Sequence, residues 1–176
     1  MRTRLLLAFT ALLCACAQPG LEPEGEASAS SGATSPDARL MRELSQANLA
    51  EIAAGKLAVE KARSSAVRQF GEHMVNEHIA LQTEGSGLAS DRGIRTPTSP
   101  DARQQAALRR LEKLSGESFE RAYLEQMVRD HAATLALLER AAGQTADPRL
   151  RALVQQALPH VREHLERARR LSAPSG

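Results

Sequence analysis

Apolar residues recur at intervals of three and four along nearly all of the chain beyond residue 35, and this periodicity constrains the fold more than any other feature. The spacing gathers them on one face of an α-helix, whereas a half-buried strand would alternate apolar and polar residues. No segment of the sequence shows that alternation. The sequence therefore predicts an all-α protein. About 140 residues are enough for a single domain with a substantial hydrophobic core.

The five letters Ser-Pro-Asp-Ala-Arg occur twice, at residues 35–39 and 99–103. Serine as N-cap, proline at the first helical position and aspartate in the first turn are typical of a helix start. Together with the glycines and prolines between the apolar stretches, they predict long helices over residues 36–63, 65–90, 119–142 and 148–171, and a shorter one over 100–114. Gly55 falls inside the first helix, and we interpret it as a point of close helix packing.

A second repeat has valine three residues before histidine. It occurs at Val75 and His78, at Val128 and His131, and at Val161 and His164. The first two copies extend backwards at a constant offset, but the second lacks eleven residues after its helix start, which is about three helical turns. A duplicated helical hairpin explains this pattern. We therefore predict a four-helix bundle made of two helical hairpins plus a short extra helix.

The repeat places one polar residue inside the apolar stripe of each long helix: Glu51, His78, His131 and His164. A buried imidazole without a partner is costly, so these groups are expected to meet each other, a water molecule or a metal ion. The set suits zinc, copper or iron. Met74 and Met127 lie one turn before two of the histidines. Either they are further ligands, which would favour copper, or they fill the core. The alternative for all four residues is a structural polar layer that fixes helix register.

The other polar residues near the repeat have simpler interpretations. The acids Glu77, Asp130 and Glu163 either bond neighbouring histidines or are solvated. His160 and His164 match the inverted zinc-protease motif His-x-x-Glu-His, but the helical context leaves no substrate cleft. His73 has no evident partner and is expected at the surface.

The first 16 residues have the layout of a lipoprotein signal. Arg2 and Arg4 precede an apolar stretch too short to span a bilayer, and a small residue then precedes Cys16. We predict a signal peptide over residues 1–15, a disordered tether over 16–34 that starts at lipidated Cys16, and the helical domain over 35–173. The predicted location is the bacterial envelope, with the outer membrane as the partner of the lipid anchor and the domain facing the periplasm. An ordinary secretory signal is the alternative.

Composition excludes several functions for the processed chain. Removal of residues 1–15 also removes Cys14, so cysteine chemistry is excluded beyond the anchor. The 23 basic residues become 21, equal in number to the 21 acidic ones, and three aromatic residues remain. Such a chain lacks the charge and stacking surface that nucleic acid requires. It has no catalytic triad, phosphate loop or cofactor fingerprint, and the sequence predicts no reaction.

Several motifs together resemble the bacterial family known as domain of unknown function 4142. They are residues 48–58, 74–78 and 123–131, together with Leu158, Pro159 and His164. The resemblance implies a ferritin-like bundle and implies no established activity. A ferritin-like di-iron site uses Glu-x-x-His pairs, and this sequence has none. Two functions remain open: a metal-binding envelope protein, or a non-enzymatic structural or stress-related envelope protein that acts through its surface.

Overall fold

A computed structural model describes residues 35–173, and the predicted signal peptide and tether lie outside the described residues. Within this range the secondary structure is entirely helical, which confirms the all-α prediction. The helices are α2 (Pro36–Lys61), α3 (Ser65–Ser90), α4 (Ala102–Glu112), α5 (Gly116–Gln144) and α6 (Pro148–Ser172). No described helix is both long enough and apolar enough to cross a membrane.

The helix starts follow local capping chemistry, with one departure from the predicted pattern. Ser35 accepts a hydrogen bond from the backbone nitrogen of Ala38, and Asp147 caps α6 with Pro148 next to it, as expected. At the second copy of the repeat, Asp101 rather than Ser99 is the cap, because its carboxylate and the side chain of Gln104 satisfy each other's backbone groups. The prediction that this helix begins at residue 100 is therefore wrong by two residues.

The start of α3 is capped differently from the other helix starts, and the start of α5 differs from the predicted one. The side chain of Ser64 makes no capping hydrogen bond for α3; instead the Glu120 carboxylate accepts from the backbone nitrogens of Arg63 and Ser64 at 2.6 and 2.7 Å. The sequence predicts that Gly116 breaks the chain before a helix at residue 119. In the structure Gly116, with φ of 56°, is the first residue of α5. A left-handed backbone at this point suits glycine and turns the chain into the helix.

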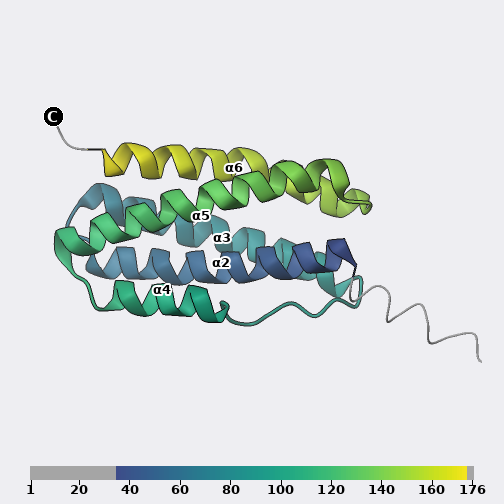
Figure 1. Cartoon of the computed structure of the whole chain (residues 1–176), viewed down its shortest axis with the longest axis horizontal. Helices are drawn as coiled ribbons and strands as arrows, with labels where there is room; N and C mark the ends of the chain where they lie inside the picture. The colour runs from purple at the N-terminus through teal and green to yellow at the C-terminus, as the bar shows by residue number, and fades with distance from the viewer. Residues whose placement is uncertain (1–34, 174–176) are drawn as a thin grey trace, which may run out of the picture.

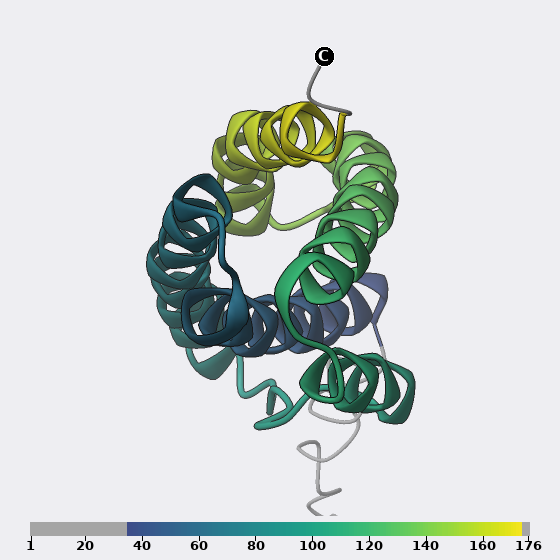
Figure 2. The same cartoon turned by 90° about the vertical axis from the view of Figure 1, so that its left-hand side faces the viewer.

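The four long helices form two antiparallel hairpins, α2 with α3 and α5 with α6, as Figures 1 and 2 show. A long connection and α4 carry the chain back along the bundle, so α3 and α5 run in the same direction (Figure 1). α4 lies outside the ring of four, beside α2 and α5 (Figure 2). One long crossover between two hairpins is the connectivity of ferritin-like bundles. The predicted helical bundle of two hairpins and a short extra helix is confirmed.

The hairpin of α2 and α3 packs closely at a pair of glycines. A Cβ atom added to Gly55 would lie 2.9 Å from the backbone oxygen of Gly71, and one added to Gly71 would lie 2.8 Å from the oxygen of Gly55. Neither residue therefore has room for a larger side chain without moving a backbone. This confirms the interpretation of Gly55 as a packing point inside a continuous helix.

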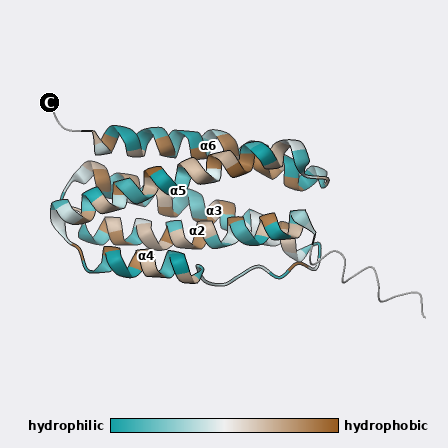
Figure 3. Cartoon of the chain, in the orientation of Figure 1, coloured by the Kyte–Doolittle hydropathy of each residue, from teal (hydrophilic) through white to brown (hydrophobic). Residues whose placement is uncertain are grey.

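The core consists of two apolar clusters, one toward each end of the bundle. The first gathers the start of α2, the end of α3, the end of α5 and the start of α6, around Leu138, Leu150 and Val154. The second gathers the opposite ends of these helices with α4, around Phe70, Phe119 and Tyr123. Figure 3 shows hydrophobic and hydrophilic residues mixed along each long helix, as expected for helices with one buried face. Between the two clusters, each long helix carries a buried polar residue.

Candidate metal centre

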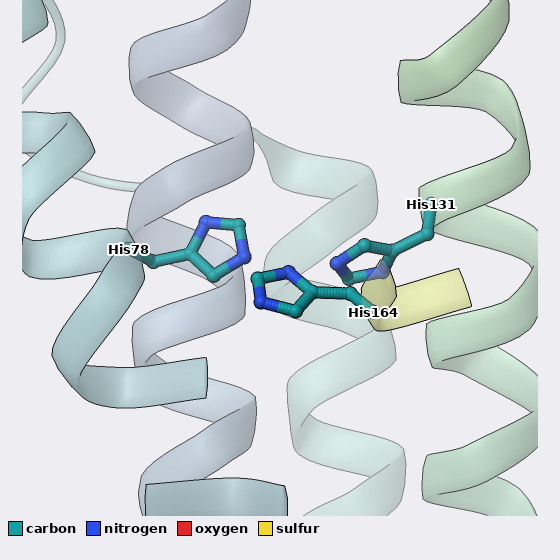
Figure 4. A group of neighbouring side chains, drawn as sticks. All are labelled: His78, His131 and His164. Carbon is teal, nitrogen blue, oxygen red and sulfur yellow. The ribbon is translucent and has the colours of Figure 1, made fainter. Parts of the chain in front are cut away.

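Three buried histidines meet at the middle of the bundle: His78 on α3, His131 on α5 and His164 on α6. The three residues are between 0 and 5 % exposed, and each offers a ring nitrogen within 4.8 Å of the others. The ring centroids are 5.3 to 5.7 Å apart. Figure 4 shows the three rings turned toward one space between the helices. We call these three residues the inner cluster.

One nitrogen of each ring in the inner cluster donates a hydrogen bond to an oxygen. His78 Nδ1 donates to Asn48 Oδ1 at 3.0 Å, and His131 Nδ1 donates to the Met127 backbone oxygen at 2.9 Å. His164 Nε2 donates to Glu77 Oε2 at 3.0 Å. Because a neutral imidazole carries one N–H, these bonds leave a lone pair on the other nitrogen of each ring. Such outer partners fix the tautomer and orientation of metal-binding histidines.

The remaining nitrogens of the inner cluster are His78 Nε2, His131 Nε2 and His164 Nδ1. All three are buried and have no hydrogen-bond partner within residues 35–173. A buried polar atom left without a partner costs about 1–3 kcal/mol. Three such atoms, each with an available lone pair, therefore lie together at one place in the core.

The environment keeps these rings neutral. Burial lowers the pKa of His131 to about 4, with His164 adding to the effect. Burial also lowers the pKa of His164 to about 4, and His73 and His160 contribute. The pKa of His78 lies well below its usual range because of burial first, and then because of the nearby histidines. A neutral imidazole is the form that binds metal ions.

Glu51, the fourth residue singled out in the sequence, is buried on α2 but is not a member of the inner cluster. Burial raises the pKa of its carboxyl group well above the usual range, and Asp130 raises it further. Its Oε2 atom has no hydrogen-bond partner among the described residues. Glu51 lines a cavity of about 50 Å³ together with His78 and His131. The structure thus brings the three histidines together and sets Glu51 beside them, across a small cavity.

The two methionines of the repeat belong to the apolar core. Met74 and Met127 are fully buried in the cluster that contains Phe70 and Tyr123. This packing supports the interpretation that they fill the core. Tyr123 is also fully buried, and its pKa is raised by burial and by the nearby carboxyl group of Glu51.

The polar residues around His164 make contacts that the sequence left open or did not predict. For Glu77 the structure supports the interpretation that it bonds histidines, because its carboxylate accepts hydrogen bonds from His160 Nδ1 and His164 Nε2, both at 3.0 Å. His73 was expected at the surface without a partner. Its side chain is only 30 % exposed, and its Nε2 lies at ion-pair distance from Glu77 Oε1, 3.4 Å, although no hydrogen bond joins the two atoms among the described residues. The signal was present in the sequence. His73 and Glu77 are four residues apart, as are His160 and His164, so each pair shares one helix face.

The apparent zinc-protease motif is resolved by the same contacts. His160 and His164 do share a face of α6, but the glutamate that they contact is Glu77 of α3. Glu163, the acid inside the motif, is exposed. The motif therefore reflects packing between α3 and α6.

Comparison with known proteins identifies a family and no relative with an assigned activity. A family model described as a domain of unknown function (DUF4142) matches residues 22–171. The match covers most of the chain and confirms the resemblance carried by the histidine repeat. No curated protein and no solved structure matches the chain.

Proposed function

The chain belongs to the DUF4142 family, whose description names no activity, and we propose that its inner cluster binds one transition-metal ion. The observation that carries the proposal is the convergence of three buried ring nitrogens that have no hydrogen-bond partner in the described part of the chain. Each ring is neutral, and each is oriented by an oxygen acceptor at its other nitrogen. These are the conditions under which histidine binds a metal ion.

The hydrogen bonding of the inner cluster favours a metal site over a purely structural polar layer. In a layer that only fixes helix register, the polar atoms are expected to hydrogen-bond one another. A buried network with some hydrogen bonds missing makes the protein less stable than an apolar core would. Here His78 Nε2, His131 Nε2 and His164 Nδ1 remain without partners inside residues 35–173. A metal ion would use all three lone pairs at once.

The donor set narrows the identity of the ion. Three imidazoles without a carboxylate differ from the two-histidine, one-carboxylate set of non-haem iron oxygenases. They also differ from the glutamate-rich di-iron site of ferritin-like proteins. Three neutral histidines are a known zinc set and suit copper equally. We therefore infer that Zn²⁺ or Cu²⁺ is bound in preference to Fe²⁺.

The cavity next to the inner cluster gives the proposed site an open position. Three protein ligands leave a tetrahedral ion one position for water or a small ligand. The cavity that His78, His131 and Glu51 line has a volume of about 50 Å³, enough for more than one water molecule. Glu51, whose pKa burial raises well above its usual range, also lines this cavity.

We further propose that the domain works in the bacterial envelope, anchored through Cys16 to the outer membrane. The support is the arrangement of Arg2, Arg4, the apolar stretch and the small residue before Cys16. The anchor can be tested by mass spectrometry of the membrane-extracted chain, which should show an acylated N-terminal Cys16. A mature chain without acylation would contradict it.

The metal content of the purified full chain tests the proposed site. Mass spectrometry should find about one zinc or copper ion per chain, and a His78→Asn/His131→Asn variant should lose most of that metal. His160→Asn is the matched control, because it removes a histidine of α6 that is outside the inner cluster, and it should keep the metal. A metal-free wild type whose melting temperature does not respond to Zn²⁺ or Cu²⁺ would refute the proposal. The histidines would then act as a structural layer, and the protein would work through its surface.

A further inference from the structure

A second group of metal-binding side chains lies on the outer side of His164. It comprises His73 and Glu77 on α3 and His164 on α6, whose ligand atoms lie within 4.8 Å of one another. We call these three residues the outer cluster. The ring of His73 packs edge-on against that of His164, with centroids 5.3 Å apart. His164 is therefore a member of both clusters.

The outer cluster extends from the surface to the core. The side chains of His73 and Glu77 are 30 and 27 % exposed, whereas that of His164 is 1 % exposed. On its other side, His164 packs against the buried rings of His78 and His131. The outer and inner clusters together therefore form a continuous row of ligand atoms that leads inward between α3 and α6.

His73 Nε2 is a second reason to regard the outer cluster as a binding site. This atom is buried and has no hydrogen-bond partner in the described range, although Glu77 Oε1 is only 3.4 Å away. The Glu77 carboxylate beside it carries a negative charge that attracts a cation. A histidine, a carboxylate and a second histidine are a common donor set for zinc and other divalent ions.

His164 can serve only one of the two clusters at a time as a neutral imidazole. Its Nδ1 faces the inner cluster and its Nε2 faces Glu77, and a neutral ring has one lone pair. A metal ion in the outer cluster uses Nε2 and leaves the proton on Nδ1. An ion in the inner cluster uses Nδ1, and Nε2 then carries the proton and donates a hydrogen bond to Glu77 Oε2, which lies 3.0 Å away in the structure. The ring therefore changes tautomer when the ion moves from one side to the other.

We infer that the outer cluster is a loading site that takes up a divalent transition-metal ion at the surface and passes it through His164 to the inner cluster. The inference rests on the proposed inner site and adds the route by which an enclosed site is filled. An enclosed metal site needs such a route. The ion exchanges His73, Glu77 and Nε2 of His164 for His78, His131 and Nδ1 of the same ring. The ring loses the proton on Nδ1 and takes one up on Nε2, so it stays neutral and the ion moves only from one side of the ring to the other.

Uptake of Co²⁺ by the metal-free full chain tests the inference, because bound Co²⁺ can be followed by visible absorption. Three variants are compared with the wild type. His73→Asn removes a ligand of the outer cluster only, and His131→Asn removes a ligand of the inner cluster only. Glu72→Gln changes an exposed acid next to His73 and is the matched control. Circular dichroism checks that each variant is folded.

The inference predicts a separation of rate from equilibrium. His73→Asn should reach the same final Co²⁺ content as the wild type but load at least tenfold more slowly, and Glu72→Gln should load at the wild-type rate. His131→Asn should still bind Co²⁺, more weakly, at the outer cluster.

Two results would overturn the inference in distinguishable ways. Loading of His73→Asn at the wild-type rate would remove the outer cluster from the route and leave the inner site standing. A single ion that is lost in His73→Asn but fully retained in His131→Asn would refute the inner site and make the outer cluster the only binding site. In that case no transfer takes place.

Discussion

The two apolar clusters at the ends of the bundle and the histidine layer between them are built on opposite principles. The clusters are filled by side chains that need only volume and burial, such as Phe70 and Leu150. The layer buries three imidazoles and the carboxyl group of Glu51, and each has one atom without a hydrogen-bond partner among residues 35–173. The same four helices supply both regions. Burial therefore stabilises the ends of the molecule and costs free energy at its centre.

This contrast explains why the histidine repeat points to function rather than to folding. Buried polar groups without partners are usually selected against, because replacing them with apolar residues is often neutral or stabilising. Sites that are kept at a cost in stability are commonly functional. In the proposed function, the apolar ends hold the three rings in place and the layer binds the metal ion.

The largest effect is expected in an apolar cluster. Phe70 is fully buried, packs against Tyr123 at 6.1 Å between centroids, and lies under the guanidinium of Arg167. Phe70→Ala should lower the free energy of unfolding by about 3–5 kcal/mol. Denaturant unfolding of the metal-free chain measures this. Ile79→Ala, at a residue 46 % exposed, is the control and should change it by less than about 0.5 kcal/mol. If Phe70→Ala lowered the free energy of unfolding less than a substitution in the histidine layer, such as His131→Leu, the contrast between the two regions would be wrong.

The pH dependence of stability should come mainly from the layer. The pKa of His131 and that of His164 fall from 6.5 to about 4 on folding. Between these values the unfolded chain binds more protons, so the free energy of unfolding should fall as pH drops from about 6.5 to about 4. Each of these histidines contributes on the order of 3 kcal/mol over that window. Glu51, whose pKa is raised, acts in the opposite direction and offsets part of the loss.

Unfolding curves of the metal-free chain across this pH range provide the measurement. His131→Leu should flatten the dependence, because it removes one titrating group. Glu51→Gln should steepen it, because it removes the opposing one. Equal slopes in the wild type and in His131→Leu would show that the layer does not control acid stability.

A smaller effect is expected where the two hairpin helices touch. Gly71→Ala places a Cβ atom 2.8 Å from the Gly55 oxygen and from the Ala58 Cβ atom, and should cost about 1–3 kcal/mol. Gly87→Ala is the matched control, since nothing lies within 4 Å of its added Cβ atom. Gly87 lies in the same helix, and Gly87→Ala should stabilise the protein by about 0.5–1 kcal/mol because alanine favours the helix. Thermal unfolding of both variants distinguishes them, and a neutral Gly71→Ala would contradict the close packing.

The sequence predicts the scaffold better than the site. Periodicity and capping residues locate all the described helices, and most boundaries fall within two or three residues, because these signals are local. The convergence of His78, His131 and His164 follows from the repeat, since each lies on the buried face of its helix. The contact of Asn48 could not be predicted in the same way, and for Glu77 the sequence left bonding to a histidine and solvation both open. Their contacts depend on how far α3 is rotated against α2 and α6, which only the packed bundle determines.

The response of the melting temperature to zinc, in the wild type and in His131→Leu, tests the central claim most directly. In the metal-free state the variant should be at least as stable as the wild type, because leucine replaces a buried polar ring. Zinc at about one hundred times its dissociation constant should add about 2.7 kcal/mol to the wild type. It should add clearly less to the variant, which keeps only the outer cluster. The wild-type melting temperature should then rise by roughly 5–10 °C. A wild type that does not respond to zinc or copper, together with a less stable metal-free variant, would contradict the account.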